Sequence, residues 1–239
     1  DEVLSYDRAD NLYKGIEISV VSPTTLSMVD EFLGGDIVGN NCGELGWTIT
    51  ADSISKAGDG ASFGIYRAFT GATIGNIAEF SLPSVKISKM YKFGTSMFVL
   101  KKFNDGATDT KLEVGWESQG NPTGRRFMVG WDFDISPNYL IWANSGGADT
   151  ITNTAVPVTL PTDQKHAIKI IITGNGDTNP VGVQIIRQTG TTTTITELDT
   201  TYAVAAVLND TPIMRMTTNV AVSKWFRADK FVYIGTPLS

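Results

Sequence analysis

The sequence predicts an all-β protein, a sandwich or jelly roll of antiparallel strands, and two observations lead to that class. Short stretches in which apolar and polar residues alternate recur along the chain, with polar turn sequences between them. No stretch sustains the 3.6-residue period of an amphipathic helix, and the best helix candidate, residues 203–208, spans only about two turns. Strand after strand at short spacing is typical of sandwiches and jelly rolls.

The clearest strands form two predicted hairpins. In residues 111–117 the apolar side chains Leu112, Val114 and Trp116 fall on one face, opposite Lys111, Glu113 and Glu117. Residues 126–135 alternate in the same way after the turn sequence SQGNPTG, with Phe127, Val129, Trp131, Phe133 and Ile135 opposite Arg126, Met128, Gly130, Asp132 and Asp134. The second hairpin joins 167–173 to 181–188 through GNGDTNP, and further strands are expected at 47–51, 62–69, 77–80 and 97–101.

Residues 30–47, DEFLGGDIVGNNCGELGW, concentrate aromatic anchors and glycines at the entrance to this β-domain. Phe32 and Leu33 supply the apolar end of one strand, and Trp47 opens another. Glycines between them allow backbone angles that side chains with a Cβ avoid. The stretch contains no base beside a nucleophile and no phosphate-binding glycine loop, so it predicts architecture and no chemistry.

This stretch resembles the opening of concanavalin-like jelly-roll proteins from tailed-phage virions, through Phe32, Gly34, Gly35 and residues 43–47. Residues 127–142, 164–188 and 211–234 resemble that family's later strands in order, whereas residues 57–60 replace its histidine-proline-glycine turn with AGDG. The resemblance implies a concanavalin A-like jelly-roll β-sandwich of two antiparallel sheets, in a single domain over 29–239. Residues 1–28 are expected to form an N-terminal arm.

The predicted arm is polar with isolated aromatic residues, and it contains one strand-like run. In that run Ile16, Ile18 and Val20 alternate with polar residues, as in a half-buried strand. Such a strand could pair with the body of the same chain or with a neighbouring subunit.

Composition excludes several partners. The chain of 239 residues has a net charge of −6 and scattered basic residues, a pattern that disfavours nucleic acid. No apolar run approaches the ~18 residues that span a bilayer, and the start lacks a signal-peptide pattern, so we expect a soluble chain with no membrane partner. Cys42 is the single cysteine, so no intrachain disulfide can form.

Candidate catalytic residues are few, and we expect no enzyme activity, no cofactor and no metal. His166 is the only histidine, and no nucleophile motif accompanies it. The family's glycan hydrolases are expected to carry three acids on one strand, and Asp132 and Asp134 supply only two. Arg126 and Met128 on the same predicted face favour a solvated charged surface.

The sequence also contains two candidate binding features. Asp132, Asp134 and Asn138 resemble half of the calcium-binding run of legume lectins, and a plain strand end is the alternative that we favour. Trp142 and Tyr139, with Tyr202, are candidates for stacking on sugar rings, and Trp142 is the one best placed for the surface.

The resemblance therefore implies a non-enzymatic virion protein, a capsid decoration or cement protein attached to the major capsid protein or other virion proteins. It places the protein on the capsid exterior or the tail, and it implies a homo-oligomer, with a trimer as one form. A carbohydrate-binding, lectin-like module of a tail fibre or adhesin that binds surface glycans is the alternative. A glycan hydrolase is a weaker one.

Overall fold

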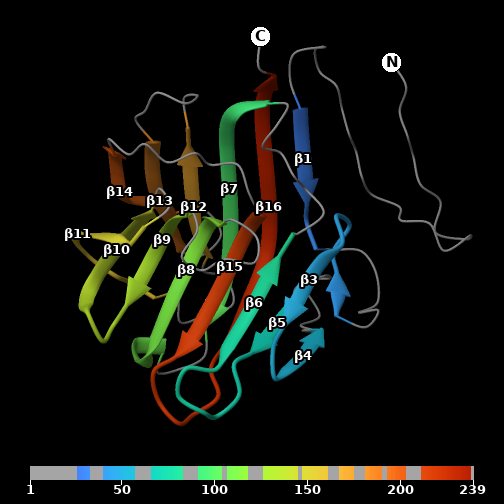
Figure 1. Cartoon of the computed structure of the whole chain (residues 1–239), viewed down its shortest axis with the longest axis vertical. Helices are drawn as coiled ribbons and strands as arrows, with labels where there is room; N and C mark the ends of the chain where they lie inside the picture. The colour runs from blue at the N-terminus through green and yellow to red at the C-terminus, as the bar shows by residue number, and fades with distance from the viewer. Residues whose placement is uncertain are drawn as a thin grey trace, which may run out of the picture.

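The computed structural model describes residues 26–32, 40–56, 66–82, 91–103, 107–117, 126–144, 147–160, 167–174, 181–189, 193–202 and 211–237. These residues form two eight-stranded sheets whose strand pairs are all antiparallel, and the two sheets lie face to face (Figure 1). Within these ranges the only helical element is one 3₁₀ turn, η3 (Ala107–Asp109). The all-β sandwich predicted from the sequence is confirmed.

We call the sheet that faces the viewer in Figure 1 the front sheet and the other the back sheet. The front sheet runs β11 (Thr150–Pro157), β10 (Ser136–Asn144), β9 (Arg126–Asp132), β8 (Thr110–Glu117), β15 (Thr211–Thr218), β6 (Ile77–Ser81), β3 (Trp47–Thr50) and β2 (Asn41–Cys42). The back sheet runs β14 (Thr193–Tyr202), β13 (Val181–Thr189), β12 (Ala167–Thr173), β7 (Tyr91–Phe103), β16 (Trp225–Pro237), β5 (Tyr66–Phe69) and β4 (Ser53–Lys56), with β1 (Leu26–Asp30) alongside β16.

The core lies between the sheets and is rich in aromatic side chains. Two tryptophans of the β8–β9 hairpin point into it, as the alternation predicts. Trp116 Nε1 donates to Ser96 Oγ at 3.0 Å, and Trp131 Nε1 donates to Thr110 Oγ1 at 3.2 Å. Each indole N–H therefore keeps a hydrogen bond although its ring is buried.

Both predicted hairpins are confirmed, with one correction. β8 pairs with β9, and β12 pairs with β13. However, β9 ends at Asp132, and the next three residues form a turn. Asp132 closes this turn, because its Oδ1 accepts from Asp134 N at 3.2 Å and its carbonyl accepts from Ile135 N at 3.0 Å. Ile135 is consequently 54% exposed and does not join the core stripe.

The opening stretch connects the sheets through the side chain of Asp30 at the end of β1. Its Oδ1 accepts from Phe32 N at 2.7 Å, and its Oδ2 accepts from Leu45 N at 2.8 Å. Gly43 has a positive φ of 71°, and a Cβ there would lie 2.6 Å from Asp30 Oδ2. A glycine is therefore required by both the backbone angle and the buried carboxyl group.

Several sequence-based expectations lie outside the described residues. They are the helix candidate at 203–208, His166, the AGDG sequence at 57–60 and residues 1–25 of the predicted arm. The last three residues of that arm, 26–28, belong to β1. In the described parts of the chain, no helix is long and apolar enough to cross a membrane.

Candidate functional site

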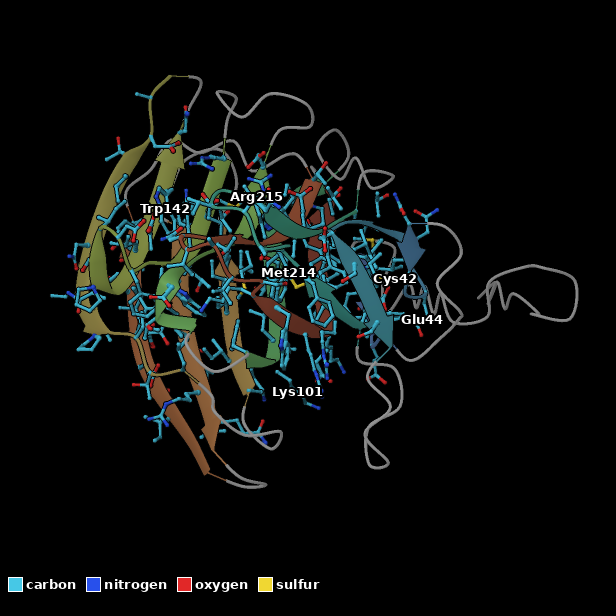
Figure 2. All side chains as sticks on the ribbon, turned by 90° about the horizontal axis from the view of Figure 1, so that it is seen from below. Cys42, Glu44, Lys101, Trp142, Met214 and Arg215 are labelled. Carbon is cyan, nitrogen blue, oxygen red and sulfur yellow. The ribbon has the colours of Figure 1, made fainter. Side chains whose placement is uncertain are left out.

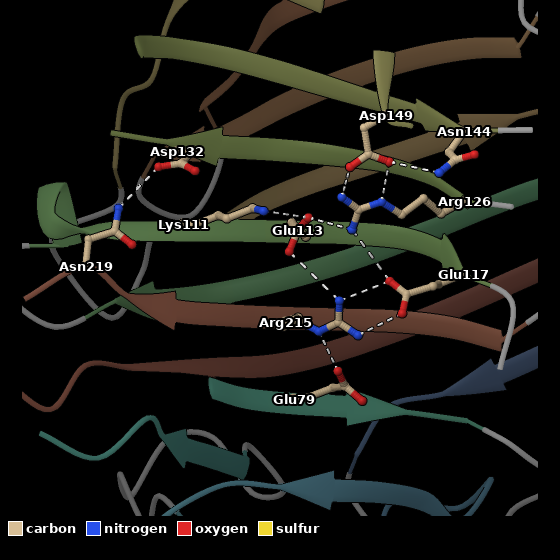
Figure 3. Close-up of polar contacts among 10 residues, drawn as sticks. All are labelled: Glu79, Lys111, Glu113, Glu117, Arg126, Asp132, Asn144, Asp149, Arg215 and Asn219. Carbon is tan, nitrogen blue, oxygen red and sulfur yellow. Dashed lines mark hydrogen bonds and ion pairs between the residues drawn. The ribbon is translucent and has the colours of Figure 1, made fainter. Parts of the chain in front are cut away.

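Charged side chains gather on the outer face of the front sheet. Because Leu112, Val114 and Trp116 enter the core, the alternating residues of β8 point away from it. Two of these residues are Glu113 and Glu117, and arginines of the two neighbouring strands lie beside them (Figure 3). We call the ion-paired set on this face the ion-pair network; it consists of Glu79, Lys111, Glu113, Glu117, Arg126, Asp149 and Arg215.

Arg126, at the start of β9, forms the ion pairs at one end of the network. Its Nη1 lies 2.9 Å from Glu113 Oε1 and 3.7 Å from Glu117 Oε2. Its Nε donates to Asp149 Oδ1 at 2.9 Å, and its Nη2 donates to Asp149 Oδ2. Burial alone would lower the pKa of Arg126, but hydrogen bonding to Asp149 and the charge of Glu113 raise it. This guanidinium is a fixed cation.

Gly115 makes room for this arrangement. It lies between Glu113 and Glu117 on the same strand and pairs with Met128 of β9. A Cβ at Gly115 would lie 2.1 Å from the carbonyl oxygen of Phe127. A side chain at that position would force β8 away from β9, and Arg126 of β9 would then move away from its carboxylate partners on β8.

Arg215 of β15 forms the ion pairs at the other end of the network. Its Nη1 and Nη2 donate to the two carboxylate oxygens of Glu117 at 3.0 and 3.1 Å, a bidentate pair. Its Nε donates to Glu79 Oε2 at 2.6 Å. Burial acts to lower the pKa of Arg215, but Glu117 and Glu79 outweigh burial and raise it. Glu117 thus lies between both arginines.

Charges in the network nearly cancel. Four carboxylates (Glu79, Glu113, Glu117 and Asp149) face three cations (Lys111, Arg126 and Arg215), and the difference, 3 − 4, is −1. The guanidiniums offer donors in a fixed geometry, and the carboxylates offer acceptors. The face therefore presents ordered polar groups without a strong field of either sign.

Trp142 does not form an exposed stacking platform, so that prediction is wrong. Its side chain is 1% exposed on the outer face of β10, where it packs with Met128, Leu140 and Ile213. Lys111 Nζ lies 5.2 Å from the centre of its ring. Met128 is also fully buried, so the predicted solvated face of β9 is a packed one.

The other aromatic candidates are also engaged. Tyr139 is buried in the core, and its hydroxyl donates to Glu197 Oε2 at 2.7 Å. Tyr202 is partly buried against the same core. Sequence reasoning put these rings near loops, but the pairing of distant strands decides their burial.

Asp132, Asp134 and Asn138 do not converge. Asp132 is buried and accepts from Asn219 Nδ2 at 3.2 Å, whereas Asp134 lies exposed in the turn. Asn138 Nδ2 donates to Asn153 Oδ1 at 3.0 Å on the neighbouring strand. Among the residues that the structure describes, no group of three or more His, Cys, Asp or Glu side chains could hold a metal ion.

Sequence reasoning missed the ion-pair network, although half of its signal was available. The alternation in β8 put Glu113 and Glu117 on one face. It could not show that Arg215, 98 positions from Glu117, would lie beside them. Figure 2 shows Arg215 and Trp142 on one side of the sandwich and Lys101 on the other, with Met214 between the sheets.

No protein-family model and no curated relative matches the sequence. Solved structures do match. A protein of unknown function, SO2946 from Shewanella oneidensis MR-1, has a TM-score of 0.56 at 14% identity, over 92% of this chain and 90% of that one. Winged bean acidic lectin complexed with methyl-α-D-galactose has a TM-score of 0.55 at 9% identity, over 90% of this chain and 100% of the lectin.

The carbohydrate recognition domain of Emp46p in its metal-free form has a TM-score of 0.52 at 12% identity, over 85% of this chain and 94% of that domain. At these identities the similarity establishes the fold alone. The chain is a concanavalin-like jelly-roll β-sandwich of the kind found in legume lectins and carbohydrate recognition domains.

Proposed function

We propose that this protein binds carbohydrate through the outer face of the front sheet. The observation that supports this most is the ion-pair network, which fixes donors and acceptors on one face with a net charge near zero. The similar structures point to the same class of ligand, since one is a lectin with a bound galactoside and another is a carbohydrate recognition domain.

Sugars are recognised by groups that can both donate to and accept from hydroxyls, and fixed groups lose little entropy on binding. Arg215 and Lys111 are partly exposed, whereas Glu113 and Glu117 lie beneath them. The outer groups can therefore contact a ligand while the inner carboxylates hold them in place. Trp142 is covered, so its ring cannot stack on a sugar at this face.

A glycan array followed by calorimetry on the best ligands tests the proposal. Arg215→Lys keeps the charge but removes the planar guanidinium that forms the bidentate pair with Glu117. We expect this substitution to weaken glycan binding about tenfold. The matched control is Lys101→Gln, which breaks an ion pair with Asp229 on the back sheet and should leave affinity unchanged. Binding that survives Arg215→Lys and is lost in Lys101→Gln would move the site to the other face.

We expect no catalysis at this face. Glycan hydrolysis needs one carboxyl group that donates a proton and a second that acts as base or nucleophile. In the network, Glu113, Glu117 and Glu79 are each held by an arginine at 2.6–3.0 Å, an arrangement suited to holding charge in place. Reducing-sugar assays on the polysaccharides that bind should therefore show no release.

A second candidate is a structural role on a phage virion, as a decoration protein bound to the major capsid protein. The edge of β1 favours it, because among the described strands β1 pairs with β16 alone and its other edge can accept a strand from another chain. The alternating run of Ile16, Ile18 and Val20 precedes β1 in the sequence. Electron microscopy of purified virions that locates the polypeptide on the capsid or the tail tests this candidate.

A further inference from the structure

The position of Asp149 against Arg126 suggests which sugars the proposed site takes. Asp149 lies just before β11, and Asn144 holds this segment because its Oδ1 accepts from Gly147 N at 2.7 Å. The Asp149 side chain is 24% exposed, whereas that of Arg126 is 9% exposed. The Asp149 carboxylate therefore covers the guanidinium on its solvent side.

Arg126 is held from below independently of Asp149. Glu113 Oε1 lies 2.9 Å and Glu117 Oε2 lies 3.7 Å from Nη1, so both contacts use the nitrogen that Asp149 does not. The Nε and Nη2 edge is left for a planar group with two oxygens, and Asp149 binds it in that way. The geometry of this edge matches a carboxylate better than a hydroxyl or a single amide.

The electrostatics at this edge favour an anion as well. Hydrogen bonding from Arg126 holds the pKa of Asp149 below its usual range, despite the partial burial of that side chain. The site is thus complementary to an ionised carboxylate in both shape and charge.

We propose that the ligand is a glycan with uronic acid residues, and that a sugar carboxylate takes the place of Asp149 on Arg126. This inference rests on the proposed function and specifies its substrate class. The exchange replaces one carboxylate with another, so the net charge of the network stays at −1 once Asp149 has moved into water. Non-specific attraction does not account for such binding, because the protein has a net charge of −6 and repels polyanions at long range.

The test is calorimetry with oligo-uronates (galacturonate, mannuronate, guluronate and glucuronate), each paired with its fully methyl-esterified form. We expect the acid to bind at least about tenfold more tightly than its ester, since a charge-assisted bidentate contact is lost in the ester. Asp149→Asn should raise affinity for the acid several-fold, because the competing carboxylate is gone. The matched control, Asp199→Asn on β14, makes the same charge change away from the network and should have a much smaller effect.

Arg126→Lys keeps the positive charge but removes the guanidinium edge that can bind a carboxylate through two hydrogen bonds. This substitution should therefore abolish the preference for the acid over its ester. Thermal melting of each variant shows whether it is folded. If the Arg126→Lys variant does not fold, the affinity of Asp149→Asn for the acid tests the inference. Equal binding of acid and ester, or weaker binding by Asp149→Asn, would overturn the inference and leave carbohydrate binding standing. Absence of binding to every sugar on the array would overturn both.

Discussion

Asp30 at the end of β1 and the half-buried Glu44 in the loop before β3 form a pair of carboxyl groups. Asp30 is fully buried, and burial followed by hydrogen bonding to Glu44 raises its pKa to about 8. The thiol of Cys42 and the hydroxyl of Tyr66 face the same site, and burial raises the pKa of both groups. Asp30 therefore holds a proton in the folded protein at neutral pH.

This pair predicts an unusual pH dependence of stability. The unfolded chain releases the Asp30 proton near pH 4, whereas the folded chain keeps it until about pH 8. Between these values the folded state binds more protons, so this group's contribution to stability falls as pH rises and is constant above pH 8. We expect the loss to amount to a few kcal/mol in urea unfolding measured from pH 5 to 8.

Glu44→Gln isolates the effect. The amide can still hydrogen-bond to Asp30, but the substitution takes away the neighbouring acid that helps to raise the pKa of Asp30. The fall in stability with pH should therefore become shallower. Glu31→Gln is the matched control, since Glu31 is exposed and pairs with Lys230 at 2.7 Å. Identical pH profiles for Glu44→Gln and the unchanged protein would contradict this account of the pair.

Gly115→Ala should destabilise the protein by about 2 kcal/mol or more, because the added Cβ collides with the carbonyl oxygen of Phe127 and separates β8 from β9. Gly147→Ala is the control, since a Cβ at Gly147 meets no atom within 4 Å. Thermal and urea unfolding of both variants measures the difference. Similar stabilities would show that the close approach of these strands is not required.

The strands of this fold could be predicted locally, but the outer face of the front sheet could not. Alternation correctly put Trp116 and Trp131 in the core, because a period of two depends only on neighbouring residues. The same rule assigned Arg126 and Met128 to a solvated face, and there it failed. Their burial comes from groups distant in sequence, such as Asp149 for Arg126 and Ile213 for Met128.

Calcium should not stabilise the protein. Asp132 already accepts hydrogen bonds from Asp134 N and Asn219 Nδ2, and Asn138 donates one to Asn153. These side chains therefore stabilise the β9–β10 turn and the β10–β11 pair. We expect melting temperatures in excess calcium and in chelator to agree within about one degree. A rise of several degrees that Asp134→Asn abolishes would establish a calcium site there.

Removing residues 1–25 should leave the sandwich folded, because every described strand lies in the remaining chain. A chain that begins at Leu26 should melt within about two degrees of the full chain and keep its affinity for glycans. A chain that begins at Glu31 lacks β1 and Asp30 and should be clearly less stable. If the virion role holds, the Leu26 chain should also fail to attach to particles, and normal attachment would count against that role.

An NMR titration of the arginine Nε–Hε signals tests most directly whether glycans bind the outer face of the front sheet. Arg126 and Arg215 report on the ion-pair network, and Arg67 and Arg227 on the back sheet report on the opposite face. With a glycan selected from the array, we predict shifts at Arg126 and Arg215 and none at Arg67 and Arg227. Shifts confined to Arg67 and Arg227 would contradict the account.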